Sequence, residues 1–110
     1  MIAYVTVGAD DIDCAERFYS AFLPDFYVKS PFDGCRALPG NGTMTAFQTR
    51  SQKQVRDLHS AALAAGGFDE GQPGFRNAYG PHFYVGYLRD PHGNKIALFS
   101  SDANEPGRDG

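Results

Sequence analysis

The stretch FYVGYLRDPHGNKIALFS, residues 83–100, decides the fold class of this chain. Two runs rich in aromatic and β-branched residues flank the short segment DPHGN, which has turn-forming residues. Asp90 and Pro91 open this turn, and Gly93 supplies the backbone freedom that it requires. The pattern predicts that the last two strands of the chain form a hairpin.

The residues before this hairpin predict a strand, a helix and a long loop. TMTAFQT, residues 43–49, alternates in the manner of a strand. The run from 51 to 65 is the clearest helix, with Ser51 as its N-cap and two glycines after its end. Residues 68–81 are rich in glycine and proline, and we interpret them as a loop.

The first half of the chain starts with the same order of elements. IAYVTVG, residues 2–8, is predicted to be a strand, and apolar residues at helical spacing predict a helix from Ile12 to Pro24. FYVKS (26–30) and CRAL (35–38) are interpreted as two short strands joined by a hairpin.

An offset of 40 residues superimposes the strand and helix of one half on those of the other. The identities are few, such as Ser20 with Ser60 and Leu23 with Leu63, so the shared order of elements carries the argument. We therefore predict an α+β domain over residues 1–101, with modules at about 1–42 and 43–101. Each is a β-α-β-β unit, the first without a clear last strand, and curved sheets with outer helices leave a central cleft. Residues 102–110 are predicted to be a flexible tail.

Composition excludes several functional classes. The 110 residues are 42% hydrophobic, so most of the chain is not disordered. A net charge of -3 without a basic block argues against nucleic acid or an anionic membrane as partner. No apolar run reaches the roughly 20 residues of a spanning helix, and the first residues lack a signal-peptide pattern. We expect a cytoplasmic protein with Cys14 and Cys35 as free thiols.

The chain resembles short bacterial members of the vicinal oxygen chelate superfamily, also called the glyoxalase/bleomycin resistance protein/dioxygenase superfamily. Three blocks carry the resemblance: YVTVGADDIDCAERFY, AFQTRSQKQVRDLHSAALAAGG and YGPHFYVGYLRDPHGNKIALF. The most specific segment is DPHGNKI, which is similar to the turn that leads into the superfamily's last strand. The resemblance implies paired βαβββ modules, a homodimer, and a cavity that often holds a divalent metal ion.

The expected metal ligands are absent at the matching positions. The resemblance implies histidine, glutamine or glutamate in the first strand of each half and in the last strand, where this chain has Tyr4, Met44 and Ala97. The histidines and glutamates that the chain does have fall in predicted helices, loops or turns or at a strand entry. A catalytic metal needs about three ligands that converge on one point, and we see no set of these residues that could do so. We therefore expect no metal or other cofactor, although a site of Gln48, His82 and a tyrosine oxygen stays conceivable.

Strand alternation selects the candidate ligand-binding residues. If the valines of the first strand pack under the helices, the other side chains of that strand face the cleft. The side chains at the corresponding positions of the matching strand in the second half and of the last strand then face the cleft as well. Of two tyrosines on opposite faces of one strand, Tyr84 is preferred to Tyr87 because Gly86 beside it leaves space. His82, just before that strand, is a candidate lid residue or acid/base group, or a plain surface histidine. The full set is Tyr4, Thr6, Met44, Gln48, His82, Tyr84, Ala97 and Phe99.

Each of these residues also has a structural interpretation. Tyr4 and Met44 are as compatible with core packing as with ligand contact, because tyrosine and methionine often fill gaps. His59, on the predicted helix, and His92, in the turn, are interpreted as structural or solvent-facing. Cys35 beside Arg36 is a weak candidate for a reactive thiolate, since neighbours in a strand point to opposite faces.

Three hypotheses for function follow. The first is a metal-free, dimeric protein that binds a small organic molecule, such as an antibiotic or an aromatic metabolite, as the sequestering proteins that it resembles do. The alternative is an enzyme: a metal-dependent glyoxalase-like lyase or extradiol-type dioxygenase with non-standard ligands, or one that uses acid/base chemistry. The third is an interaction module whose own side chains fill the cleft.

Overall fold

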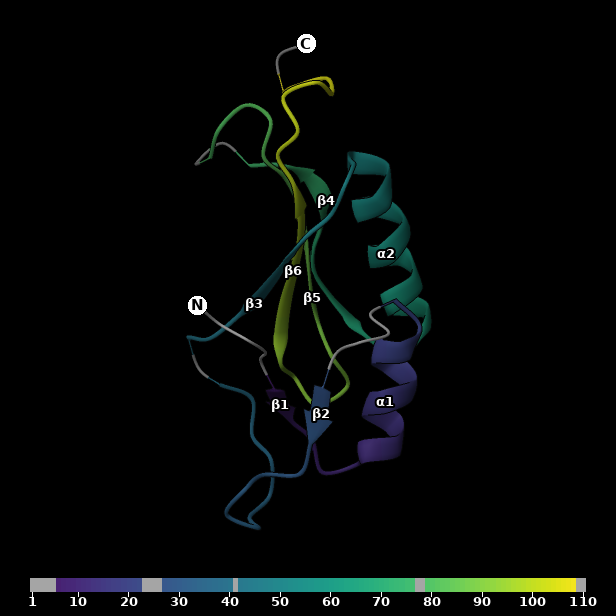
Figure 1. Ribbon diagram of the computed structural model, residues 1–110, viewed down its shortest axis with the longest axis vertical. Helices are drawn as coiled ribbons and strands as arrows, with labels where there is room; N and C mark the ends of the chain where they lie inside the picture. The colour runs from purple at the N-terminus through teal and green to yellow at the C-terminus, as the bar shows by residue number, and fades with distance from the viewer. Residues whose placement is uncertain (1–5, 23–26, 41, 77–78, 109–110) are drawn as a thin grey trace.

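The computed structural model describes residues 6–22, 27–40, 42–76 and 79–108. Figure 1 shows both helices on one side of the strands, stacked along the long axis of the molecule. The chain alternates strands and helices in the order β1–α1–β2 and β3–α2–β4–β5–β6. The α+β class predicted from the sequence is therefore confirmed.

The second module is a complete βαβββ unit. Its sheet has the order β3-β6-β5-β4, in which β3 is parallel to β6 and the other neighbours are antiparallel. The predicted hairpin around the DPHGN turn is confirmed as the pair β5 and β6. The bounds are β3 Thr45–Gln48, α2 Gln52–Ala64, β4 Phe68–Phe75, β5 Tyr84–Arg89 and β6 Lys95–Ser100.

The fourth strand of this sheet corrects the sequence interpretation. Glycine and proline favour a loop over residues 68–81, but β4 pairs along β5. The pairing shifts register twice, between Asp69 and Gly71 and again between Gly71 and Gly74. Since β4 lies at the sheet edge, the glycines and Pro73 are tolerated at these irregularities.

The first module is smaller than expected. Strand β1 (Thr6–Gly8) and strand β2 (Tyr27–Lys29) form a two-stranded parallel sheet, with helix α1 (Ile12–Ser20) between them in sequence. The prediction of a strand at residues 35–38 is wrong. The backbone N–H of Ala37 donates to the Asp10 carboxylate (2.6 Å), and neighbouring Leu38 is exposed. This segment is held by a side chain and not by a strand partner.

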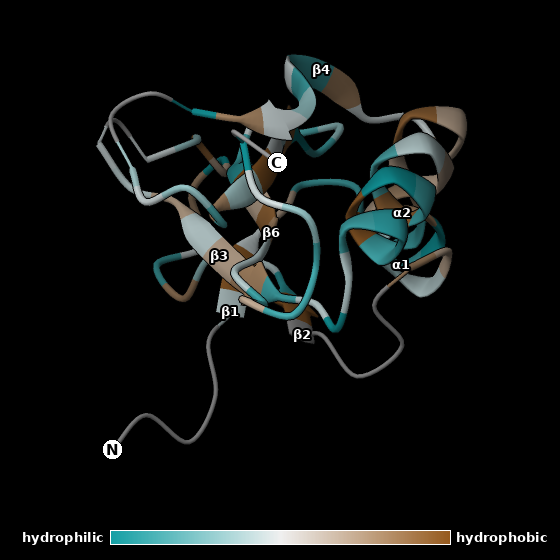
Figure 2. Cartoon of the chain, turned by 90° about the horizontal axis from the view of Figure 1, so that it is seen from above, coloured by the Kyte–Doolittle hydropathy of each residue, from teal (hydrophilic) through white to brown (hydrophobic). Residues whose placement is uncertain are grey.

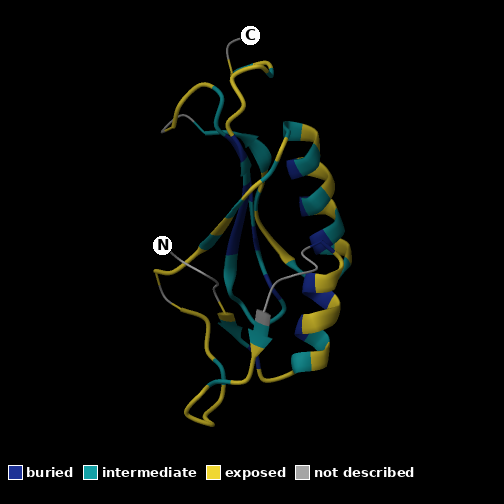
Figure 3. Cartoon of the chain, viewed as in Figure 1, coloured by how far each residue is buried: buried dark blue, intermediate teal, exposed yellow. Residues whose placement is uncertain are grey.

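The hydrophobic core lies between the helices and the sheets. Helix α1 contributes Phe18 and Tyr19, and helix α2 contributes Val55 and Ala62. Figure 3 shows the buried parts of both helices on the sides that face the strands. Figure 2 shows hydrophobic colour along the strands and broad hydrophilic bands on α2. The two modules therefore share one core under one layer of helices.

The DPHGN turn fastens the second module to the first. The fully buried Asp90 carboxylate accepts hydrogen bonds from the Tyr19 hydroxyl (2.6 Å), from the His92 and Asn94 backbone N–H groups and from the Asn94 amide. The Asn94 amide also donates to the Gly8 carbonyl (3.2 Å). The predicted structural role of His92 agrees with this arrangement, since His92 Nε2 accepts from the Asp11 backbone N–H.

The C-terminal residues are bound to the rest of the chain as far as residue 108. The Glu105 carboxylate accepts from the Gln52 backbone N–H at the start of α2 (2.9 Å). The Arg108 backbone N–H donates to the Pro81 carbonyl (2.7 Å). The polar sequence predicts a flexible tail, whereas these hydrogen bonds hold the segment against the rest of the chain. A polar segment can be held by hydrogen bonds even where it makes few apolar contacts.

Two further expectations concern the chain as a whole. The two cysteines do not form a disulfide: Cys14 is half-buried and Cys35 is exposed, and both are free. No helix in the described part of the chain is long and apolar enough to cross a membrane.

Candidate ligand-binding site

The four-stranded sheet has two faces of different character. Phe47, Gly86 and Leu98 stand opposite one another in the ladder and face the core under α2. Since side chains alternate along a strand, the residues next to them point the other way, away from α2. We call this second side the open face. Its side chains are Ala46, Gln48, Val85, Tyr87, Arg89, Lys95, Ala97 and Phe99.

Small and aromatic residues lie side by side on the open face. Ala97 stands between Ala46 on β3 and Tyr87 on β5. Two residues further along β6, Phe99 stacks on the ring of Phe83, with 5.3 Å between ring centroids. Ala97 is buried, but Ala46 and Gln48 are exposed, so the accessible surface lies toward β3.

Two cations lie close to the ring of Tyr87. The Lys95 Nζ lies 5.1 Å from the ring centroid and the Arg76 guanidinium carbon lies 5.5 Å from it. The Arg76 guanidinium also donates to the Gln72 carbonyl (2.8 Å). A Cβ built at Gly71 or Gly74 would lie 3.1 or 3.3 Å from guanidinium nitrogens, so the absence of side chains there makes room for Arg76.

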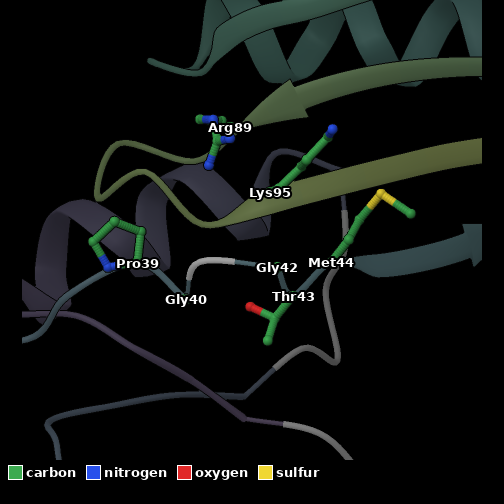
Figure 4. Close-up of a pocket in the computed structure, with 7 residues that line it drawn as sticks. All are labelled: Pro39, Gly40, Gly42, Thr43, Met44, Arg89 and Lys95. Carbon is green, nitrogen blue, oxygen red and sulfur yellow. The ribbon is translucent and has the colours of Figure 1, made fainter.

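A pocket of about 470 Å³ adjoins the open face at the end where β5 finishes and β6 begins. Arg89 and Lys95 line one side of it, and Met44, just before β3, lines the other (Figure 4). The remaining lining residues are Pro39, Gly40, Gly42 and Thr43. Arg89 is engaged in an ion pair with Glu70, 2.7 Å between Nε and Oε1. Lys95 lines this pocket and also lies beside the ring of Tyr87, so it is the residue that the two regions share.

The chain is similar to several solved structures. A glyoxalase/bleomycin resistance protein from Albidiferax ferrireducens is 31% identical, with 93% of this chain and 99% of that chain covered and a TM-score of 0.83. The chain belongs to the glyoxalase/bleomycin resistance protein/dioxygenase superfamily. No protein-family model and no curated protein sequence matches it.

More distant members of the superfamily show the same fold. A glyoxalase-related enzyme from Fulvimarina pelagi has a TM-score of 0.71 at 21% identity, with coverage of 91% of this chain and 87% of that chain. A family enzyme from Burkholderia phytofirmans has a TM-score of 0.69 at 17% identity, with coverage of 91% and 98%. At these identities the likeness concerns the fold alone.

The predicted cleft residues are only partly brought together. Gln48, Ala97 and Phe99 share the open face, and Met44 lines the adjoining pocket. Thr6 is exposed on β1, and Tyr4 lies outside the described residues. His82 stands apart from this group in contact with the C-terminal segment, where a Cβ at Gly107 would lie 3.1 Å from its Nε2.

The structure does not place Tyr84, the tyrosine preferred from the sequence, on the open face. Tyr84 is buried in the core cluster, pairs with Phe75 across β4 and β5, and belongs to the side that α2 covers. The space beside Gly86 is used by a core residue: a Cβ there would lie 3.0 Å from the His59 ring. Tyr87, three residues after Tyr84, is the tyrosine whose side chain lies on the open face.

His59 is a structural residue, in agreement with its predicted place on the helix. Its side chain is buried, and Nε2 donates to the Tyr87 carbonyl (3.0 Å) where the register shift of β4 interrupts strand pairing. Asp69 Oδ1 lies 3.3 Å from the same nitrogen. The backbone N–H of Gly71 and the Gln72 amide, which both donate to Asp69, lower the pKa of its carboxyl. This group supports the sheet from the helix side.

The described residues do not fit a divalent metal site of the kind found in the superfamily. Met44 and Ala97 occupy two positions where the resemblance implies ligands, and neither side chain is a histidine or carboxylate ligand. Within residues 6–22, 27–40, 42–76 and 79–108, no three histidine, cysteine, aspartate or glutamate side chains gather in a group that could hold a metal ion.

Sequence reasoning missed Lys95, Arg76 and Phe83. Strand alternation predicts Lys95 on this face, because it lies an even number of positions from Ala97 and Phe99 along the same strand. Arg76 follows a strand that has the composition of a loop, so its approach to Tyr87 had no signal in the sequence.

Proposed function

We propose that this superfamily member binds a small aromatic molecule on the open face of its four-stranded sheet, without a metal ion. The observation that supports this best is the pocket of about 470 Å³ beside Met44 and Lys95, since Lys95 also lies beside the ring of Tyr87 on the open face. Ligand pockets typically have volumes of roughly 300–1,000 Å³ and combine apolar walls with a few polar groups. Met44 and Phe99 offer apolar contact, and Gln48 offers an amide.

Binding alone is a sufficient role for such a site. Sequestration of an antibiotic or an aromatic metabolite needs affinity and no reaction, and therefore no cofactor. The Albidiferax relative is named a glyoxalase/bleomycin resistance protein, and resistance to a drug is consistent with this type of role. A cytoplasmic location is part of the proposal, since free cysteines suit a reducing compartment.

A homodimer is also part of the proposal. The chain measures 50 × 28 × 23 Å, with a radius of gyration of 14.7 Å, against about 13 Å for a compact domain of this length. Phe32 and Leu38 are highly exposed on the loop after β2. A second copy that covers such apolar side chains would reduce the surface in contact with water.

A fluorescent ligand tests the binding site. N-phenyl-1-naphthylamine is neutral and aromatic, and its emission rises when it leaves water. We expect it to bind the wild-type chain, and we expect Ala46→Phe to raise the Kd about tenfold or more, because the added ring occupies accessible surface next to Ala97. Ala64→Phe is the matched control, since Ala64 is exposed on α2 on the other side of the sheet.

Two results would contradict the proposal. If Ala46→Phe and Ala64→Phe bind the dye with the wild-type Kd, the ligand does not occupy the open face. If untagged protein purified without chelator contains about one transition-metal ion per chain, the metal-dependent lyase or dioxygenase alternative replaces it. Thermal unfolding followed by circular dichroism verifies that both variants are folded.

A further inference from the structure

The open face carries a local excess of positive charge. Arg76, Arg89 and Lys95 all lie at or beside Tyr87 and the adjoining pocket, whereas the whole chain has a net charge of -3. Glu70 is paired with Arg89 and compensates that one cation. The charge of this region is therefore opposite in sign to that of the chain.

Arg76 and Lys95 have no carboxylate partner in the part of the chain that the structure describes. The ion pairs there join Arg36 to Asp10, Lys53 to Asp57, His59 to Asp69 and Arg89 to Glu70. Both cations are half-buried, so their charges are screened by water less than those of exposed side chains. Two cations in this situation favour an anion beside them.

The position of Arg76 is fixed by its surroundings. The guanidinium donates to the carbonyls of Gln72 (2.8 Å) and Phe75 (3.3 Å) and lies over two glycines of β4. Because the guanidinium is held by backbone groups, a ligand need not order it on binding. Its remaining N–H donors are left for a group with acceptor oxygens.

The spacing on β6 sets the size of a molecule that could reach both ends of the face. Phe99 and Lys95 are each two residues from Ala97 on the same side of the strand, about 6.7 Å in either direction at the usual rise per residue. An aromatic ring near Phe99 or Met44 could therefore place a substituent at Lys95 without extending beyond the face.

We infer that the ligand is an aromatic anion, whose carboxylate or similar acidic group lies close to the two cations beside Tyr87, Lys95 and Arg76. This inference rests on the proposed function and adds the charge of the ligand to it. The ring makes the apolar contacts, and the two cations select molecules that carry a negative group.

A pair of isosteric competitors tests the inference. 1-Naphthoate and 1-naphthamide have the same ring and differ in charge, and each is used to displace N-phenyl-1-naphthylamine from the wild-type chain. We expect naphthoate to displace the dye at a concentration about tenfold lower than naphthamide, with the ratio falling as salt is raised. Lys95→Gln and Arg76→Gln are each expected to lower that ratio several-fold. Arg56→Gln is the control that keeps it, because Arg56 lies on α2 beside Tyr84, on the side of the sheet away from the open face.

The outcomes separate the inference from the proposal on which it rests. Failure of the dye to bind folded wild-type protein overturns both. Dye binding with equal displacement by naphthoate and naphthamide leaves the proposed function in place and overturns the inference. A preference for naphthoate that persists unchanged in both Lys95→Gln and Arg76→Gln also overturns it, because the anion is then held elsewhere.

Discussion

At the scale of single residues, the Asp90 side chain directly joins the two modules. Its carboxylate has no exposed surface and accepts four hydrogen bonds, one of them from Tyr19 on α1. Burial, followed by this hydrogen bond, raises the pKa of Tyr19 far above its ordinary value, so the hydroxyl remains a donor at all ordinary pH values. The pair connects α1 directly to the β5–β6 turn.

Asp90→Ala is expected to lower the free energy of unfolding by about 3 kcal/mol, because it leaves buried donors of Tyr19 and Asn94 without an acceptor. Urea denaturation of the wild type and the variant measures the change. Asp33→Ala, in an exposed loop, is the control and should alter stability by less than about 0.5 kcal/mol. Equal stability of Asp90→Ala and Asp33→Ala would show that the turn does not hold the modules together.

The tyrosines of β5 show how far residue-level prediction goes. Strand alternation correctly indicates that Tyr84 and Tyr87 point to opposite sides, but it does not say which side α2 covers. Gly86 suggests space for a ligand, whereas the structure fills that space with His59 from α2. The sequence contains no sign of that contact, since the two residues are 27 positions apart and meet only after the helix packs.

At the scale of elements, strong local patterns are confirmed and weak ones are not. Helix α2 has a Ser51 cap and begins and ends close to the predicted bounds, and the hairpin at DPHGN follows from turn residues between two apolar runs. Strand β4 has neither alternation nor β-branched residues, and it exists because β5 offers an edge with which to pair. Tertiary pairing of this kind leaves no local signature.

The segment after β2 shows the opposite error. CRAL has strand-like composition, but the Asp10 carboxylate binds the backbone of Ala37, and Arg36 forms an ion pair with the same aspartate (3.3 Å). A side chain 27 residues away thus takes the place of a strand partner. The first module consequently has two strands within the described residues, although the repeat predicts more.

At the scale of the whole molecule, association of two chains is the main expectation. Light scattering at micromolar concentration should give a mass of twice the 12.0 kDa of the chain. Replacing both Phe32 and Leu38 with serine should shift the equilibrium toward the monomer. The variant has less exposed apolar surface at these positions, so dimer formation removes less of it from water. A wild-type mass of one chain would contradict the dimer, and a dimer unaffected by both changes would place its interface elsewhere.

The superfamily could be recognised from the sequence because the turn and the final strands lie close together in the chain. The open face could be predicted only in part, because it depends on which side α2 covers and on where β4 places Arg76. Ala46 and Ala97 lie opposite each other on that face in the structure. Their methyl groups therefore report on the proposed site.

Alanine methyl groups offer the sharpest test of ligand binding on the open face. Protein labelled with ¹³C in these methyl groups is titrated with N-phenyl-1-naphthylamine and followed by two-dimensional NMR. We expect the methyl signals of Ala46 and Ala97 to shift with ring currents from the dye, while those of Ala62 and Ala64 on α2 do not. Shifts confined to the α2 alanines, or no shifts at a saturating concentration, would contradict binding on the open face.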